Sequence, residues 1–149
     1  MKMEWCSMAM KSGKRQKGSS GYNRKATEDF LNRNRQKSGV VETESGLQYL
    51  IVEESEGPKP SLEHTVVVHQ RISLIDGTPV DDTYQKDIPA EFTMKEAIPG
   101  YREGLMLMSV GSRYKFFIPP DLAWGKRGAG AKIGPNALLV IDARLLEIF

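Results

Sequence analysis

The chain has 149 residues, of which 40% are hydrophobic and 27% are charged, a composition that suits one ordinary globular core. Its net charge is +2, but residues 1–40 carry 10 Lys and Arg against 3 Asp and Glu, whereas the remainder carries 11 against 16. The single cysteine, Cys6, excludes an internal disulfide, and no apolar run approaches the roughly 20 residues of a membrane-spanning helix. We therefore expect a soluble domain in a reducing compartment, with a head of net charge +7 and a body of net charge −5.

The basic start of the chain, residues 1–21, is interpreted as a disordered leader. Between Glu4 and Lys11 lies only a short apolar mix, whereas a secretory signal needs an apolar centre of about 7–15 residues. This interpretation predicts a cytoplasmic location. A periplasmic location is the alternative if the true N-terminus of the protein is not Met1. The charge of the leader would attract nucleic acid or a membrane surface by non-specific electrostatics, but a solvated tail is the favoured interpretation.

Residues 22–46 are expected to hold one short helix and a linker. The helix is predicted over residues 26–37, where Thr27 suits the cap and the acidic pair that follows it suits the positive end of the helix dipole. A helix this short is marginal alone, so it must dock on the body or on a partner, or fray. Residues 40–46 are interpreted as the linker.

From residue 47 onward the pattern favours strands. The expected strands are residues 47–52, 65–75, 92–94, 113–118 and 137–148. A helix is predicted from residue 98, because Pro99 suits a first helical turn, and Tyr101, Leu105 and Met108 recur at helical spacing. The expected fold class is α+β, with an antiparallel five-stranded curved sheet wrapped around one short helix.

Two glycines in this predicted helix, Gly100 and Gly104, lie one turn apart. Glycine lowers helix stability, so this spacing indicates the close approach of a neighbouring backbone or ligand. Leu105 and Met108 are interpreted as core residues, which leaves Tyr101 as the helix residue available for a pocket.

Three blocks of sequence together resemble FKBP-type peptidyl-prolyl isomerases. They are VVVHQRISLIDGTPVDD at residues 66–82, IPGYREGLMLMSVGSRYKFFIPPDLAWG at residues 98–125 and IGPNALLVIDARLLEI at residues 133–148. The resemblance implies an FKBP-type domain over residues 47–149. The preceding segment is similar to bacterial members of the macrophage infectivity potentiator (Mip) type. Those members carry a longer helical dimerisation segment than the one short helix here, so monomer and dimer both stay open.

The activity that the resemblance implies needs no acid, base, metal or cofactor. An amide bond resists rotation by about 18–20 kcal/mol, and before proline the cis and trans forms differ little in energy. An apolar pocket lowers the barrier by favouring the twisted amide, excluding water and fixing the flanking carbonyls with backbone donors. The expected substrates are proline-containing peptides or unfolded protein chains, and macrolide inhibitors are the expected small ligands.

The resemblance also assigns site residues. Catalytic roles fall to Asp81, whose carboxylate faces the twisting amide, to Tyr101, whose ring forms the pocket floor, and to Trp124. The substrate-binding walls are Gln70, Val80, Ala90, Phe92, Ala97, Ile98, Ile133 and Ile141. The backbone N–H of Ile98 is expected to anchor a ligand carbonyl, and Asp82 is expected to be solvated. A simpler interpretation is that Ile98 and Ile141 only pack in the core. Likewise, Asp81 and Asp82 are explained more simply as turn residues.

Several of these positions depart from the family pattern. Gln70 and Trp124 stand where the family has tyrosine, Val80 where it has phenylalanine, Ala90 and Ile141 where it has further aromatics, and Tyr101 where it has tryptophan. Each lost aromatic contact weakens ligand binding by about 0.5–1.5 kcal/mol beyond the area lost. Isomerase activity weakened by the loss of aromatics is therefore expected. The alternative is a catalytically weak FKBP-like peptide-binding or chaperone module.

Two other features invite different chemistry. The glycine-rich residues 125–130 resemble a phosphate-binding loop, but they lack its Gly-Lys-Ser/Thr spacing, so a flexible flap over the pocket is expected instead. Lys126, Arg127 and Lys132 would then favour acidic peptide flanks. His64 and His69 have no thiolate near them in the sequence, so no metal site is expected and His69 is interpreted as structural.

Overall fold

In this computed structural model, the chain is described over residues 20–125, 127–129 and 133–149. The predicted leader, residues 1–21, lies outside this part of the chain except for its last two residues, which belong to helix α1 (Ser20–Arg35). The helix thus begins before residue 26 and ends before residue 37, so both predicted ends are wrong. The early start has a tertiary cause that no local pattern carries, because the first half of α1 bonds to residues more than 100 positions further along the chain.

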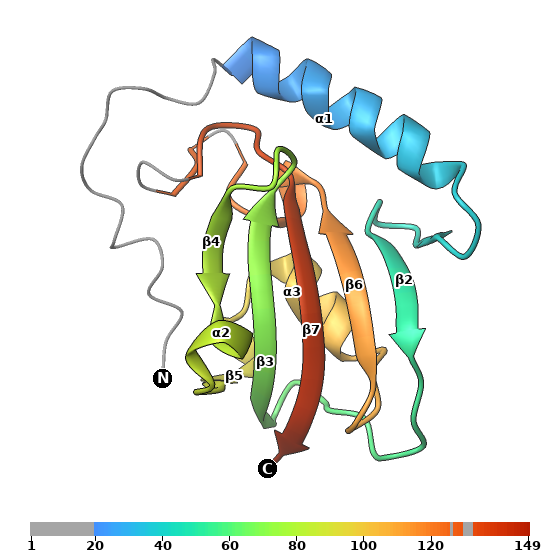
Figure 1. Cartoon of the computed structure of the whole chain (residues 1–149), viewed down its shortest axis with the longest axis vertical. Coiled ribbons are helices and arrows are strands. Elements are labelled where there is room, and N and C mark those ends of the chain that lie inside the picture. Colours follow the sequence, from blue (N-terminus) through green and yellow to red (C-terminus); the bar gives the residue numbers. More distant parts are fainter. Residues whose placement is uncertain (1–19, 126, 130–132) are drawn as a thin grey trace.

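The body is one seven-stranded antiparallel sheet, curved around a short helix (Figure 1). Its strands are β1 (Val41–Glu42), β2 (Gln48–Glu53), β3 (Thr65–Leu74), β4 (Pro79–Asp82), β5 (Ala90–Thr93), β6 (Arg113–Ile118) and β7 (Leu139–Ile148). The order is β1-β2-β6-β7-β3-β4, with β5 paired to the other end of β3. The helices of the body are α2 (Thr83–Lys86) and α3 (Pro99–Leu105), with 3₁₀ turns at Met94–Glu96 and Pro120–Leu122.

The predicted α+β class and the curved antiparallel sheet around a short helix are confirmed, but the strand count is seven rather than five. The two missed strands are β1, which lies in the predicted linker, and β4, which follows the turn at Gly77. Two and four residues are too short to show an alternating pattern, and both strands form because a longer neighbour supplies the hydrogen bonds.

Alternation along the strands separates the two faces of the sheet. On β3, Val66, Val68, Gln70 and Ile72 are buried, whereas the residues between them are partly or fully exposed. The buried set faces α3, where Tyr101 and Leu105, with Met108 just after the helix, complete the core. Gln70 is the polar member of this buried row, which makes it the first place to look for a functional contact.

The two glycines of α3 allow the helix to lie directly on β6. A Cβ added at Gly104 would collide with the ring of Phe116, and one added at Gly100 would collide with the side chain of Ile118. The predicted close approach is present, but core side chains of the sheet make the nearest contacts, rather than the expected backbone or ligand.

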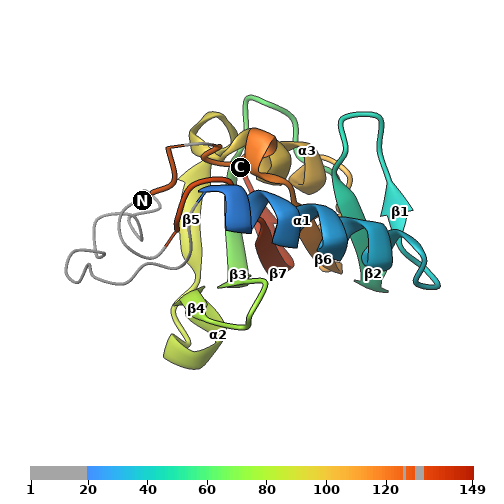
Figure 2. The same ribbon diagram turned by 90° about the horizontal axis from the view of Figure 1, so that it is seen from above.

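Helix α1 crosses one end of the sheet, from the loop before β7 to strand β2 (Figure 2). Near its start, Thr27 donates a hydrogen bond to the carbonyl of Asn136 at 3.2 Å. Near its end, Asn34 donates to the side chain of Gln48 at 2.8 Å, and the ring of Phe30 packs on Phe117. The helix docks on the body, and Thr27 is a buried mid-helix residue rather than the predicted cap. Within the described residues, no helix has the length and hydropathy to cross a bilayer.

Candidate active site

Tyr101 lies in the first turn of α3 and has no exposed surface. Its ring packs against Phe92 of β5 and Phe116 of β6, with centroid distances of 5.7 and 6.2 Å. The sequence places it there because Pro99 starts the helix and directs the next turn onto the concave face. Tyr101 therefore lies inside the apolar cluster, and its role as a pocket floor remains a prediction.

A chain of hydrogen bonds runs from this ring to the surface. The Tyr101 hydroxyl donates to Gln70 Oε1 at 2.8 Å, and Gln70 Nε2 donates to Asp81 Oδ2 at 2.9 Å. Lys86 Nζ reaches the other carboxylate oxygen at 3.1 Å. A side-chain amide both accepts and donates, so Gln70 satisfies the phenol and the carboxylate at once. Two of the departures from the family pattern, at Gln70 and Tyr101, therefore act as a pair.

Burial keeps the phenol of Tyr101 protonated. Loss of solvent, with the nearby Tyr84 phenol and Asp81 carboxylate adding to it, raises the pKa of Tyr101 well above its ordinary value. The hydroxyl therefore remains a hydrogen-bond donor at every physiological pH, and it fixes the orientation of the Gln70 amide.

The two acidic residues after Val80 have separate tasks. The Asp81 side chain is 15% exposed and is held by Gln70 and Lys86, so its carboxylate is oriented but still reaches solvent. Asp82 caps α2 by accepting from the backbone N–H of Gln85, and it pairs with Arg71 at 3.1 Å. The expectation that Asp82 is simply solvated was wrong, because its carboxylate starts a helix.

The structure brings the other expected wall residues into the same cluster. Val80, Ala90, Phe92, Ala97, Ile133 and Ile141 are each at most 4% exposed and belong to the hydrophobic core. Ile98 and Trp124 pack against this core but are only partly buried. Because Tyr101 is fully covered, the parts of the cluster that reach solvent are Ile98, Trp124 and the Asp81 carboxylate.

The backbone N–H of Ile98 stands just before α3, and none of the described residues accepts a hydrogen bond from it. Arg102, which the sequence analysis did not select, supports this turn. Its guanidinium donates to the carbonyl of Ala97 at 2.8 Å and to that of Met94 at 3.2 Å. The sequence shows only that Arg102 lies in the first turn of a helix that begins with proline. An arginine at such a position is ordinarily expected to be solvated, so the sequence did not indicate this role.

The loop after Trp124 is closed by backbone hydrogen bonds. Asn136 N–H donates to Gly125 O at 2.7 Å, and Ala129 N–H donates to Ile133 O at 2.8 Å, which turns Ile133 toward the core. From α1, Asn23 donates to the carbonyl of Pro135 at 2.8 Å. The helix before the domain therefore holds the loop that carries two expected site residues. Two lysines of the predicted flap, Lys126 and Lys132, lie outside the described residues.

The histidines have structural contacts. His69 Nδ1 lies 2.9 Å from Thr83 Oγ1 and its ring stacks on Tyr84, whereas His64 Nδ1 accepts from the backbone N–H of Ser61. The structural interpretation of His69 is confirmed. In the part of the chain that the structure describes, no three His, Cys, Asp or Glu side chains gather as a metal site would require.

The fold defines a small α+β domain of the FKBP-like class. The chain belongs to the family of FKBP-type peptidyl-prolyl cis–trans isomerases, because the model of that family matches residues 57–146. A second model, the domain amino terminal to FKBP-type peptidyl-prolyl isomerase, matches residues 2–51. The predicted resemblance, including its Mip-like branch, is confirmed.

Named relatives support the same assignment. The chain is 46% identical over 126 residues to the FKBP-type isomerase FkpA of Aeromonas hydrophila, covering 85% of this chain and 47% of the relative. It is 41% identical over 138 residues to the outer membrane protein MIP of Legionella longbeachae, covering 89% and 59%. The chain therefore spans about half to three-fifths of the length of these relatives.

Solved structures agree on the fold. FkpA from Escherichia coli matches with a TM-score of 0.83 and 35% identity, covering 87% of this chain and 60% of that one. A peptidyl-prolyl isomerase from Pseudomonas syringae matches with a TM-score of 0.82 and 29% identity, covering 90% and 98%.

Proposed function

We propose that this protein accelerates the cis–trans rotation of X-Pro bonds in peptide or unfolded-protein substrates. The observation that carries the proposal is the backbone N–H of Ile98, which no described residue accepts from and which lies, like the partly exposed Trp124, against the apolar cluster of an FKBP-type domain. The unit proposed to carry the activity is residues 47–149.

The proposed mechanism is geometric. A substrate carbonyl accepts from Ile98 N–H while the proline ring packs on Ile98 and Trp124, which removes water from the planar amide and favours its twisted form. The Asp81 carboxylate, oriented by Gln70 and Lys86, faces the amide as it rotates. Arg102 is proposed as a positioning residue, because it holds the carbonyl of Ala97 next to the anchoring N–H.

A peptide-binding or chaperone module with little catalysis is the second candidate. One observation favours it: the Tyr101 ring has no exposed surface, so a ligand would have to uncover the floor to reach it. Such a module would bind unfolded chains at Ile98 and Trp124 and suppress their aggregation without accelerating isomerisation.

A proline-tetrapeptide isomerisation assay separates the two candidates. We expect measurable acceleration that falls about tenfold, or about 1.4 kcal/mol, on Asp81→Ala. Tyr101→Phe is the better second variant, because Tyr101→Ala would also open a core cavity. Glu91→Ala, on the exposed face of β5, is the matched control. Wild-type protein that binds the tetrapeptide without accelerating rotation would support the module instead.

Ligands, assembly and location are also proposals. We propose macrolide binding at the same cluster, which inhibition in the isomerisation assay tests. Oligomeric state, monomer or dimer, is tested by light scattering of the full chain. The cytoplasmic expectation finds no support among the relatives, and the name outer membrane protein carried by one of them favours the periplasmic alternative, which cell fractionation tests. Contacts of the basic leader with nucleic acid or membrane concern residues outside the described part of the chain.

A further inference from the structure

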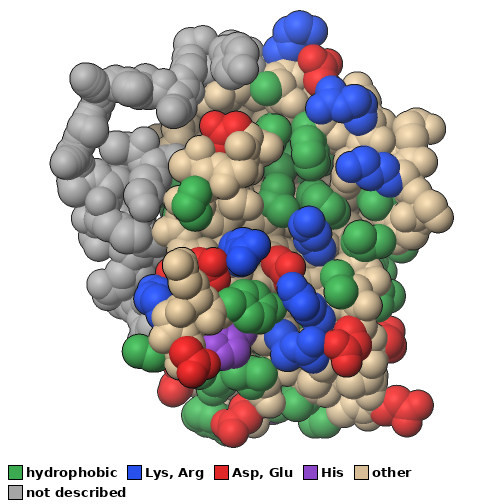
Figure 3. Space-filling view, viewed as in Figure 1, with side chains coloured by type: hydrophobic (Ala, Val, Ile, Leu, Met, Phe, Trp, Pro, Cys, Tyr) green, Lys and Arg blue, Asp and Glu red, His purple; other side chains and the backbone are tan. Residues whose placement is uncertain are grey.

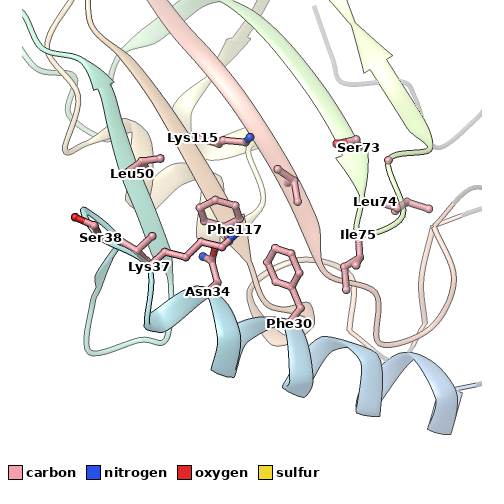
Figure 4. Close-up of a pocket in the computed structure, with 13 residues that line it drawn as sticks. Phe30, Asn34, Lys37, Ser38, Leu50, Ser73, Leu74, Ile75, Lys115 and Phe117 are labelled. Carbon is pink, nitrogen blue, oxygen red and sulfur yellow. The ribbon is translucent and has the colours of Figure 1, made fainter.

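A hollow lies on the convex face of the sheet, away from α3. It has a volume of about 350 Å³ and lies between α1 and strands β2, β6, β7 and β3 (Figure 4). Phe30 of α1 and Leu50, Phe117 and Val140 of the sheet are among its lining residues. We call this hollow the α1 groove. It shares no lining residue with the site proposed for proline.

The walls of the α1 groove are mainly apolar. Phe117 and Val140 are cross-strand partners on β6 and β7, and the Phe30 ring lies 5.8 Å from that of Phe117. Figure 3 shows apolar side chains gathered on this face near α1, whereas charged side chains dominate further along the strands. Its volume lies at the lower end of the range found for ligand pockets.

Two lysines line the same groove. Lys37 follows the end of α1, and Lys115 lies on β6 directly opposite Leu50. Neither forms an ion pair with any described residue. Asp142 is the cross-strand neighbour of Lys115, but both of its carboxylate oxygens accept from Arg113 at 2.9 Å. The groove therefore combines apolar walls with two uncompensated positive charges.

We propose that the α1 groove binds an extended segment of another polypeptide in which an acidic residue adjoins an apolar one. The lysines attract the carboxylate, and the aromatic and aliphatic walls receive the apolar side chain. The same charges repel the segment before α1, residues 1–19, which carries five Lys and Arg against one Glu, so the occupant comes from elsewhere. The hydroxyls of Ser38 and Ser73, which also line the groove, make no hydrogen bond within the described residues and suit peptide carbonyls.

This inference is independent of the isomerase proposal. Tyr101 and Gln70 point to the concave face, whereas Lys115 and Phe117 point to the convex face of the same sheet. A peptide without proline can therefore occupy the groove while the proline site stays free. With both sites occupied, the protein would hold an unfolded chain in the α1 groove by a segment with an acidic and an apolar residue while an X-Pro bond of the same chain isomerises at the other site.

The test uses the full chain and a proline-free hexapeptide of alternating Leu and Glu. We expect saturable binding by calorimetry, with NMR shifts of backbone amides concentrated at Leu50, Phe117 and Val140. Reversal of both charges, Lys37→Glu with Lys115→Glu, should weaken binding by about tenfold or more and should strengthen binding of the matched Leu and Lys peptide. Added salt should weaken the binding of the acidic peptide to wild type.

Two further variants keep the outcome interpretable. Ser73→Phe fills the groove without changing charge and should also weaken the acidic peptide. Lys59→Glu, an exposed loop lysine, is the matched charge control and should not. Equal affinity of wild type and the double reversal, equal affinity for both peptides, or shifts confined to residues around Ile98 would overturn the proposal. Urea unfolding and circular dichroism of the variants would show that they are folded. If the protein bound anionic vesicles but not the peptide, the occupant would be a lipid surface, and the proposal would also be overturned.

Discussion

The two faces of the sheet differ in polarity although the same alternating strands form both. The concave face is mainly apolar, and it carries the hydrogen-bonded line from Tyr101 through Gln70 to Asp81 and, apart from it, the contact of Tyr114 with Glu54. The convex face carries the bidentate Arg113–Asp142 pair and the Arg144–Glu53 pair in contact with water. Because low dielectric strengthens hydrogen bonds and makes unpaired groups costly, the concave face is where small changes should have large effects.

The two faces also differ in which parts of the molecule stabilise them. The core and the candidate site share residues on the concave face, so packing and function are difficult to separate there. The convex face gains its shape from α1, a helix that lies outside the sheet and contacts both its edge and the loop before β7. Variants on the two faces should therefore divide into those that unfold the domain and those that change one contact.

The sharpest test compares two consecutive residues of β6 that face opposite ways. Phe116→Ala should lower the free energy of unfolding by about 4 kcal/mol, because it empties a fully buried site under α3. Lys115→Ala should change it by less than about 0.5 kcal/mol. Urea unfolding measures both. Comparable losses would mean that the convex face contributes to the core, and the comparison of faces would fail.

Gln70→Leu tests the polar line on the concave face. The variant leaves the buried Tyr101 hydroxyl without its acceptor and should cost about 2 kcal/mol of stability. Tyr101→Phe added to it removes the stranded hydroxyl, so the double variant should be more stable than Gln70→Leu alone. Urea unfolding of both variants gives the coupling. A double variant that is less stable by the sum of the two single losses would show that the hydrogen bond contributes nothing.

Thr27→Val tests the support from α1. It removes the donor to the Asn136 carbonyl while keeping the side-chain shape, and should cost about 1 kcal/mol. Hydrogen exchange at the Asn136 amide, which closes the loop onto Gly125, should accelerate, and isomerisation should slow. Arg35→Ala, which breaks an exposed ion pair at the other end of α1, is the control. Unchanged exchange in Thr27→Val would mean that α1 does not hold the loop.

The smallest expected effect concerns the pKa values of two tyrosines, one on each face of the sheet. Burial first, then Asp142, raises the pKa of Tyr84 on the convex face to about 12, and burial with Glu54 raises that of Tyr114 on the concave face to about 12. A raised folded pKa favours the neutral phenol, so this stability is complete below the unfolded value near 10 and is lost as pH rises through the folded value. Phenolate absorbance against pH measures it. Asp142→Asn should lower the pKa of Tyr84 and leave Tyr114 unchanged.

The predicted site residues could be named from the sequence because they follow motifs along the chain. The resemblance assigned Asp81, Tyr101, Ile98 and Trp124 to one site. In the structure Tyr101, Ile98 and Trp124 belong to or pack against one apolar cluster, and Gln70 joins Asp81 to it, but the site itself remains a prediction. The resemblance did not reveal that Gln70 joins Tyr101 to Asp81, because that bond connects three separate elements. Arg102 was missed for a related reason: its importance comes from carbonyls on the turn before its own helix.

By itself, the sequence determined the class of fold and the faces of the long strands, because alternation and glycine spacing are local and depend on nearest neighbours. Tertiary structure alone decided the short strands β1 and β4, the early start of α1 and the α1 groove. β1 and β4 depend on hydrogen bonds from the longer neighbouring strands β2 and β3. The start of α1 and the α1 groove depend on residues distant in the chain, such as Pro135 for Asn23 and Phe117 for Phe30. Short elements have too few residues to be stable alone, so their partners determine whether they form.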